Sequence, residues 1–197
     1  MKKTGMRTGR PVNGGGNRAS IIAAARQEFA AHGYRGATLR LIAMRAGVDV
    51  ALLSHYFGNK DGLFAETLEL PEEARRGIAA ALSTGPIETR GEQVTRCYLG
   101  LWEAPATREQ MLTLARSGIS NEAASTRLRN LLTGPTGDTA FDGMPAGARA
   151  GIALAMAELL GVAIARHLFH IQPIAELEFE TLVARTTPSI QRHFGST

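Results

Sequence analysis

The sequence lacks several features that define whole classes of protein. Cys97 is its one cysteine, so no disulfide can form within the chain, and a secreted disulfide-rich scaffold is excluded. Segments that alternate apolar and polar residues are short, so β-strands are not expected. The basic, glycine-rich residues 1–17 do not have the composition of a signal segment. The longest apolar stretch, residues 151–169, contains Glu158 and Arg166, which argues against a membrane span and favours a cytoplasmic protein.

Catalytic and metal-binding motifs are missing as well. The three glycines at 14–16 are not followed by the Gly-Lys-Ser or Gly-Lys-Thr of a phosphate-binding loop, and no Gly-x-Ser-x-Gly sequence occurs. His167 and His170 lie three residues apart, a spacing that allows metal binding, but no third ligand is close in sequence. We therefore predict neither an enzyme nor a metal site, and we expect no cofactor.

The residues that are present favour a helical protein with unevenly distributed charge. The chain has 197 residues, 44% of them hydrophobic and many of them alanine or leucine, which favours an all-α fold with a sizeable core. Residues 1–62 contain ten Lys or Arg against three Asp or Glu, whereas residues 63–197 contain twelve against fifteen. A basic amino-terminal third suggests contact with a polyanion such as DNA, although a solvated basic face is the alternative.

The strongest local signal is a pair of short helices, expected over residues 39–46 and 50–57 because apolar residues recur there at helical spacing. Gly47 stands where the first helix must end in a left-handed conformation. Thr38 and Asp49 are good N-caps for the two helices. The pattern predicts a helix-turn-helix, the unit that fits the major groove of DNA.

Helices are also expected on both sides of this pair. A helix over residues 18–32 would bury Ile22, Ala25 and Phe29 and would end at Gly33. After the pair, a helix over residues 59–83 should be kinked or divided by Pro71. The remaining helices, which bring the expected number to nine, cover residues 88–104, 106–118, 121–132, 148–170 and 174–194. Between them, residues 133–147 are predicted to form a loop.

Residues 18–64 contain a pattern made of Arg18, Ile22, Ala24, Ala25, Phe29, Gly33, Thr38, Ile42, Ala43, Ala46, Gly47, Val48, Tyr56, Phe57, Lys60, Leu63 and Phe64. In these residues the segment resembles the amino-terminal domain of the TetR/AcrR family of bacterial repressors. Ser54 and Asp49 depart from the common pattern, in which tyrosine is frequent at the first position and serine is usual at the second.

The resemblance implies a nine-helix TetR-like architecture. Its parts are a disordered basic arm (1–17), a three-helix helix-turn-helix DNA-binding domain (18–64) and a helical ligand-binding and dimerisation domain (65–197). It further implies a homodimer that binds a palindromic DNA operator and is released by a small-molecule effector. It favours repression over activation. It also implies that the protein lies in the cytoplasm of a bacterium, associated with the nucleoid. A helical interaction module without specific DNA binding is the alternative.

The predicted DNA-binding residues surround the second helix of the pair. They are Thr38, Arg40, Asp49, Val50, Ala51, Leu52, Ser54, His55, Tyr56 and Lys60. The apolar residues 50–52 can contact thymine methyl groups, and the polar residues that follow can reach base edges. The resemblance implies phosphate contacts from Thr38, Tyr56 and Lys60. The alternatives are a Tyr56 that is mainly a core residue and a His55 that is simply exposed.

Other basic residues could add to this surface. Arg40 and Arg45 can reach a phosphate or a guanine edge, and the alternative for Arg45 is a solvated position. The arm carries Lys2, Lys3, Arg7 and Arg10, which we expect along the minor groove unless the arm is an incidental charged tail.

The second domain is expected to hold a small, mostly apolar effector. The predicted pocket residues are aromatic, soft or apolar: Cys97, Tyr98, Leu101, Trp102, Met111, Leu114, Phe141, Met144, Met156 and His167. Glu103, Arg116 and His167 are candidate polar anchors. The alternative is that these residues form only the core.

The last two helices carry more apolar surface than one subunit is expected to cover. We predict that two copies form a four-helix bundle there. The predicted interface residues are Ile152, Met156, Leu159, Leu160, Leu168, Leu182, Ile190 and Phe194. The alternative is that both helices only complete the core of the monomer.

Overall fold

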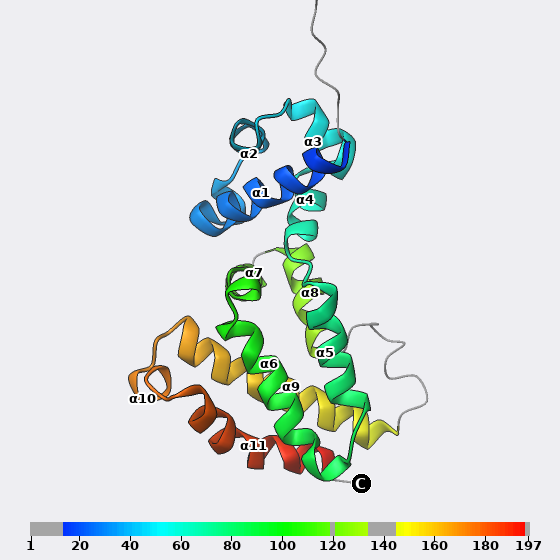
Figure 1. Ribbon diagram of the computed structural model, residues 1–197, viewed down its shortest axis with the longest axis vertical. Coiled ribbons are helices and arrows are strands. Elements are labelled where there is room, and N and C mark those ends of the chain that lie inside the picture. Colours follow the sequence, from blue (N-terminus) through cyan, green and yellow to red (C-terminus); the bar gives the residue numbers. More distant parts are fainter. Residues whose placement is uncertain (1–13, 119–120, 134–144, 196–197) are drawn as a thin grey trace, which may run out of the picture. The chain divides into compact units, whose positions relative to one another are not determined.

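A computed structural model describes residues 14–118, 121–133 and 145–195 of the protein (Figure 1). Over these residues the regular elements are all helices, which confirms the predicted all-α fold. The chain divides into two compact units, residues 1–63 and residues 64–197. Most of the predicted basic arm lies outside the described residues, including Lys2, Lys3, Arg7 and Arg10.

The first unit contains three helices and the start of a fourth. They are α1 (Gly14–Gly36), α2 (Leu39–Ala46), α3 (Val50–Phe57) and α4 (Lys60–Thr67). Helical geometry in α1 is interrupted at Gly33, where φ is 66°, as the sequence predicts. The helix begins earlier than expected, so residues 14–17 belong to it and not to the arm.

The buried face of α1 differs by one residue from the predicted one. Ile21 is fully buried with Ala25 and Phe29, whereas Ile22 is only partly buried. Residues 21, 25 and 29 are spaced by four, so they form a single stripe along the helix. Ile22 lies about 100° further around the helix and faces away from the centre of that stripe.

The second unit is an array of helices that follows the end of α4. They are α5 (Glu72–Ser83), the 3₁₀ turn η1 (Ile87–Thr89), α6 (Arg90–Glu103), α7 (Pro105–Ser117), α8 (Glu122–Thr133), α9 (Ala146–His167), α10 (Gln172–Ala175) and α11 (Phe179–Gly195). The expected helix over 59–83 is divided by residues 68–71, where Pro71 precedes α5. The expected helix over 174–194 is divided as well, into α10 and α11. The described residues therefore contain eleven α-helices where nine were expected.

Helix α6 lies at the centre of the second unit and packs against α5, α7, α9 and α11 (Figure 1). Two glycines bring the backbone of α11 close to its neighbours. A Cβ atom on Gly91 of α6 would lie 2.7 Å from the Cα atom of Gln191, and one on Gly151 of α9 would lie 2.2 Å from the carbonyl oxygen of His193. The side chain of Gln191 also accepts a hydrogen bond from Gly91 N (2.7 Å) and donates one to the carbonyl oxygen of Ile87 (2.8 Å). Helix α11 is therefore seated by direct backbone contact.

Helix α9 has one face in the core and another at the surface. Its length and a mean hydropathy of 1.7 over 18 residues would suit a membrane span, but a third of that window is buried and the helix packs against α6, α8, α10 and α11. Its buried residues include Ile152, Met156 and Leu159. The exposed stripe opposite them is also apolar and consists of Leu154, Ala157 and Gly161.

Candidate DNA-binding site and effector pocket

The turn between α2 and α3 is defined by capping groups at each helix end. Leu41 N donates to Oγ1 of Thr38 (3.2 Å) at the start of α2, and Ala51 N donates to Oδ1 of Asp49 (2.7 Å) at the start of α3. Gly47 ends α2 with φ 68° and ψ 33°, a conformation that side chains rarely tolerate. These local bonds fix the turn, and the sequence predicts all three of these residues in these roles.

Helix α3 buries one edge and exposes the other. Leu53 and Phe57 are buried, while the opposite edge, which includes Ala51, Ser54 and His55, is exposed. All ten predicted DNA-binding residues are exposed or partly exposed: Thr38, Arg40, Asp49, Val50, Ala51, Ser54 and His55 are exposed, and Leu52, Tyr56 and Lys60 are partly buried. They remain available to a partner, and their contact with DNA stays a prediction.

An aromatic contact orients Lys60 at the start of α4. Its Nζ atom lies 4.5 Å from the centre of the Tyr34 ring. The hydroxyl of Tyr34 donates to Oδ1 of Asp61. Burial, together with this hydrogen bond to the Asp61 carboxylate, raises the pKa of Tyr34 to about 12. The ring therefore stays neutral and holds the Lys60 ammonium group in place.

Arg45 has a structural partner that sequence reasoning missed. Its Nε atom lies 2.6 Å from Oε1 of Glu28, a residue of α1 that is 3% exposed, and Nε2 of His32 lies 3.6 Å from the other carboxylate oxygen. The signal in the sequence is Glu28 itself, because an acidic residue next to Phe29 on the buried stripe of α1 needs a cationic partner. Arg45 therefore joins α2 to α1, and its contact with a phosphate stays a prediction.

Apolar side chains at the surface of α2 were also not anticipated. Leu41 and Met44 are exposed, Met44 to 73%, whereas Ile42 and Ala43 between them are buried. Because they lie on the same side as the exposed Arg40, they widen the candidate surface beyond α3.

The predicted effector residues are mostly core residues of the second unit. Buried among them are Tyr98, Leu101, Trp102, Met111, Leu114, Met156 and His167. Cys97 is partly buried, and burial raises the pKa of its thiol. Phe141 and Met144 lie outside the described residues. Between Ile78, Ala81, Val94, Cys97, Tyr98 and Met156 the packing leaves no space that would hold a water molecule.

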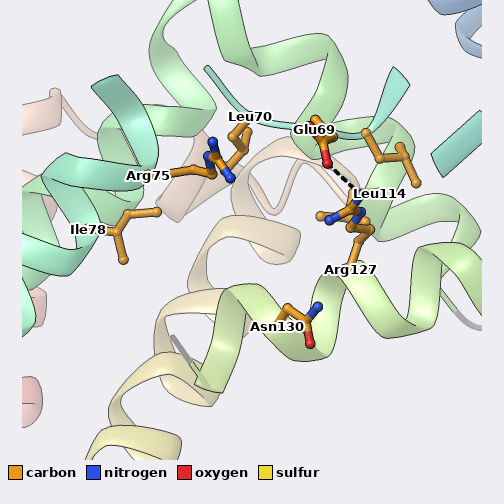
Figure 2. Close-up of a pocket in the computed structure, with 8 residues that line it drawn as sticks. Glu69, Leu70, Arg75, Ile78, Leu114, Arg127 and Asn130 are labelled. Carbon is orange, nitrogen blue, oxygen red and sulfur yellow. Dashed lines mark hydrogen bonds and ion pairs between the residues drawn. The ribbon is translucent and has the colours of Figure 1, made fainter. Parts of the chain in front are cut away.

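A larger pocket, with a cavity volume of about 90 Å³ and partly open to solvent, lies beside the break between α4 and α5 (Figure 2). It is lined by Leu68, Glu69, Leu70, Arg75, Ile78, Leu114, Arg127 and Asn130. Of these, only Leu114 was predicted. The others come from α5, α8 and the segment before Pro71, and no local sequence pattern shows that these three elements meet.

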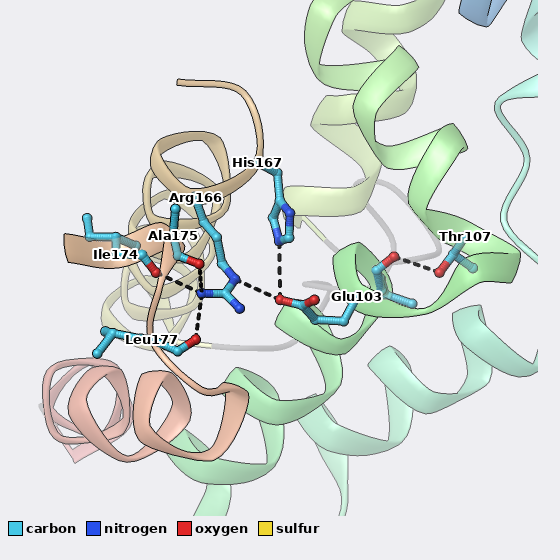
Figure 3. A network of polar contacts seen from close by, with 8 residues as sticks. Glu103, Thr107, Arg166, His167, Ile174, Ala175 and Leu177 are labelled. Carbon is cyan, nitrogen blue, oxygen red and sulfur yellow. Dashed lines mark hydrogen bonds and ion pairs between the residues drawn. The ribbon is translucent and has the colours of Figure 1, made fainter. Parts of the chain in front are cut away.

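Two candidate polar anchors, Glu103 and His167, contact each other, and Glu103 also pairs with Arg166 (Figure 3). Oε1 of Glu103 lies 2.7 Å from Nε of Arg166 and 3.5 Å from Nε2 of His167. Nη1 of Arg166 also donates to the carbonyl oxygens of Ile174, Ala175 and Leu177 (2.7, 3.1 and 2.9 Å). This cluster ties α6 and α9 to the end of α10. The third candidate anchor, Arg116, is exposed on α7.

His167 is neutral in this setting. Burial lowers its pKa below the usual 6.5, the carboxylate of Glu103 opposes that shift, and the guanidinium groups of Arg166 and Arg108 add to it. Its ring stacks on Trp102, with centroids 5.7 Å apart and planes 12° apart. Over the residues that the structure describes, no three potential metal ligands gather.

The fold and the α2–α3 geometry define a helix-turn-helix protein of the DNA-binding class. Residues 21–67 match the family described as bacterial regulatory proteins, tetR family, and residues 88–194 match the tetracyclin repressor-like C-terminal domain. The second match alone covers more than half of the chain. The protein therefore belongs to the TetR family of transcriptional regulators, which confirms the resemblance seen in the sequence.

Individual relatives agree with this assignment. The crystal structure of a TetR-family regulator from Streptomyces coelicolor is 32% identical, with a TM-score of 0.68, and the alignment covers 98% of this chain and 100% of that one. The HTH-type transcriptional regulator BetI of Paraburkholderia phytofirmans is 41% identical over 68 residues, and that of Agrobacterium fabrum is 40% identical over 74. These two matches cover 34% and 36% of this chain. The chain spans about a third of the length of these curated relatives, 31% and 36% respectively.

Proposed function

We propose that this TetR-family regulator is a repressor that binds a palindromic DNA operator as a homodimer and is released by a small, mostly apolar effector. The observation that carries the proposal is the exposed edge of α3, held between the Asp49 cap and the buried Leu53 and Phe57. This arrangement presents the first turn of a helix to the major groove while its other edge is anchored in the unit.

Charge and side-chain chemistry support DNA as the partner. The excess of basic residues in the chain lies within residues 1–62, so attraction to phosphate would act on the unit that contains α3. The apolar first turn of α3, with Val50 and Ala51 exposed, suits contact with thymine methyl groups. Thr38, Tyr56 and Lys60 would contact phosphates around it.

A gel shift with duplexes covering the promoters of the protein's own chromosome tests this proposal. We expect wild-type protein to retain at least one duplex specifically at modest ionic strength. Ala51→Glu places a carboxylate at the exposed first turn of α3 and should weaken binding by about tenfold or more. Ala30→Glu adds the same charge to the exposed face of α1 and is the matched control. Failure of the wild type to retain any duplex would contradict the proposal, and a reporter gene separates repression from activation.

The surface of α9 supports the homodimer. Ile152, Met156, Leu159, Leu182 and Ile190, five of the eight residues predicted for the interface, are buried within one subunit and are core residues there. The other three predicted residues are partly exposed: Leu160, Leu168 and Phe194. The apolar stripe of Leu154, Ala157 and Gly161 is open to solvent, and its small residues would let a second helix approach closely. We therefore place the proposed interface on this stripe and the three partly exposed residues.

The effector would bind in the second unit. The soft and aromatic core around Tyr98, Trp102 and Met111 supports an apolar ligand, because such side chains can repack around one. A thermal-shift screen of small molecules is expected to find stabilising compounds that are mainly apolar. A screen in which only highly charged compounds stabilise the protein would contradict this part of the proposal.

A further inference from the structure

The segment between α4 and α5 is fastened by two side chains from distant parts of the second unit. Nε2 of Gln110, on α7, donates to the carbonyl oxygen of Glu69 (3.0 Å). Nη2 of Arg127, on α8, donates to Oε1 of Glu69 (2.6 Å; Figure 2). Glu69 comes two residues after the end of α4, so these bonds hold the chain just after that helix.

The larger pocket is formed around the contacts of Gln110 and Arg127 with Glu69. Its apolar wall consists of Leu68, Leu70, Ile78 and Leu114. Its polar groups are the guanidinium groups of Arg75 and Arg127, the carboxylate of Glu69 and the amide of Asn130. The guanidinium group of Arg75 is paired with the carboxylate of Glu72, and that of Arg127 with the carboxylate of Glu69. A ligand that matches the pocket has an apolar body, and a carboxylate is the group that can take the place of Glu69 on Arg127.

The Glu69 carboxylate is suited to replacement on Arg127 by the carboxylate of a ligand. Both side chains are partly exposed, 42% for Glu69 and 37% for Arg127, and ion pairs of that exposure are weak. The contact joins one guanidinium nitrogen to one carboxylate oxygen, whereas a free carboxylate can bind arginine through two parallel hydrogen bonds. A ligand carboxylate can therefore compete with the Glu69 side chain for Arg127.

We propose that this pocket binds a small carboxylate with an apolar body, whose carboxylate replaces that of Glu69 on Arg127. The apolar body lies against Leu114 and Ile78. Occupancy releases the side chain of Glu69 and leaves the hydrogen bond from Gln110 to the Glu69 carbonyl oxygen in place. This inference rests on the proposed function, because it assigns the proposed effector to this pocket, which meets the core of the second unit at Leu114, and names its class and its first effect on the chain.

Calorimetric titration of the full-length protein without DNA tests the inference. The probes are hexanoate, octanoate, decanoate and phenylacetate. Their methyl esters and the corresponding alkylammonium ions are controls for charge. We expect at least one carboxylate to bind about tenfold or more tightly than its ester, because the ester cannot form the charged pair with Arg127. The alkylammonium ions should bind more weakly still, because an ammonium group cannot replace the carboxylate of Glu69 on Arg127.

Two variants separate exchange from a merely structural role. Arg127→Met should weaken carboxylate binding about tenfold or more and should leave ester binding unchanged. Glu69→Gln should strengthen carboxylate binding severalfold, because the competing charge is removed. Arg129→Met, at an exposed position of α8 outside the pocket, is the matched control. An increase in affinity in Glu69→Gln is not expected if the pair only stabilises the fold.

The inference is overturned if no carboxylate binds, if esters or alkylammonium ions bind as well as carboxylates, or if Glu69→Gln weakens binding. The comparison of carboxylate with ester needs only wild-type protein, so it stands even where a variant fails to fold. Because these titrations contain no DNA, their outcome is independent of whether the protein retains a promoter duplex. A gel shift of the retained duplex with the tightest carboxylate then shows whether binding releases DNA.

Discussion

The surroundings of Glu28 explain how α1 and α2 of the DNA-binding unit are joined. A carboxylate that is 3% exposed is costly unless it is paired, and its partners, Arg45 and His32, come from α2 and from the next turn of α1. The pair holds the last turn of α2 against α1. A basic residue of a DNA-binding unit can therefore be a packing residue, although it contributes to the same positive charge.

Arg45 and Arg40 should separate stability from DNA binding. Arg45→Met leaves Glu28 without its closest cationic partner and should lower the free energy of unfolding by about 1–2 kcal/mol, less than for a fully buried pair because Arg45 is half exposed. Arg40→Met, on the exposed face of the same helix, should leave stability unchanged and weaken DNA binding. Urea denaturation and gel shifts measure the two effects.

A double-mutant cycle tests whether Arg45 and Glu28 are energetically coupled. Glu28→Gln should cost less stability in the Arg45→Met background than in the wild type, because the unpaired charge is then removed. Equal costs in both backgrounds would show that the two residues are not coupled.

At the scale of elements, the position of α11 depends on the absence of side chains at two crossings. Gly91 and Gly151 let its backbone lie directly against α6 and α9. Gln191 adds hydrogen bonds at the first crossing. The bidentate pair of Arg96 with Glu180 joins the same two helices at the surface. The close crossing, and not the ion pair, is expected to determine how α11 packs, because an exposed pair contributes little.

Gly151→Ala tests this view of α11. The added Cβ atom would lie 2.2 Å from the carbonyl oxygen of His193, so α11 must shift, and the free energy of unfolding should fall by about 1–3 kcal/mol. Gly147→Ala is the matched control, since it is on the same helix and its Cβ atom would meet nothing within 4 Å. It should be neutral or slightly stabilising. Thermal unfolding followed by circular dichroism measures both, and equal effects would contradict the close crossing.

Local signals predicted the elements well, and contacts between distant elements were predicted poorly. The bounds of α2 and α3 follow from Thr38, Gly47 and Asp49, whose capping bonds involve neighbours within a few residues. The residues that line the larger pocket come from α5, α7, α8 and the segment before Pro71, and no periodicity reveals that Glu69 meets Arg127. The stripe of α9 that faces the core also depends on where α6 and α11 lie, so the apolar pattern alone did not distinguish core from surface.

At the scale of the whole molecule, the two units differ in charge and in what holds them together. The first carries the basic excess, and the second contains the larger core and the neutral, buried His167. A protein with this division can bind an anionic polymer through one unit and an apolar molecule through the other.

Burial of His167 should make the second unit less stable in mild acid. Its pKa in the folded protein lies below 6.5, so as the pH falls below 6.5 the unfolded chain takes up a proton that the folded chain does not. Stability should therefore fall with pH in that window, by at most about 1.4 kcal/mol per pH unit from this residue. His167→Gln should flatten the dependence, and His55→Gln, at an exposed position on α3, should not. Denaturation at pH 7, 6 and 5.5 checks this prediction, and an unchanged slope in His167→Gln would contradict it.

The oligomeric state is the second prediction for the whole molecule. Leu154 is 57% exposed on the apolar stripe of α9, and Leu154→Arg places a charge where a partner helix is expected. We expect the wild type to sediment as a dimer and the variant to shift towards monomer. Ala184→Arg, at an exposed position of α11, should not change the mass. A monomeric wild type would exclude the homodimer. A Leu154→Arg variant that is still a dimer would place the interface elsewhere.

Trp102, fully buried against the ring of His167, is the chain's one tryptophan. Its fluorescence therefore reports on the core of residues 64–197 and carries no direct signal from the helix-turn-helix. Circular dichroism averages over every helix in the molecule. Melting curves that differ between the two signals would reveal, without any label, that one half of the regulator can lose its structure while the other keeps it.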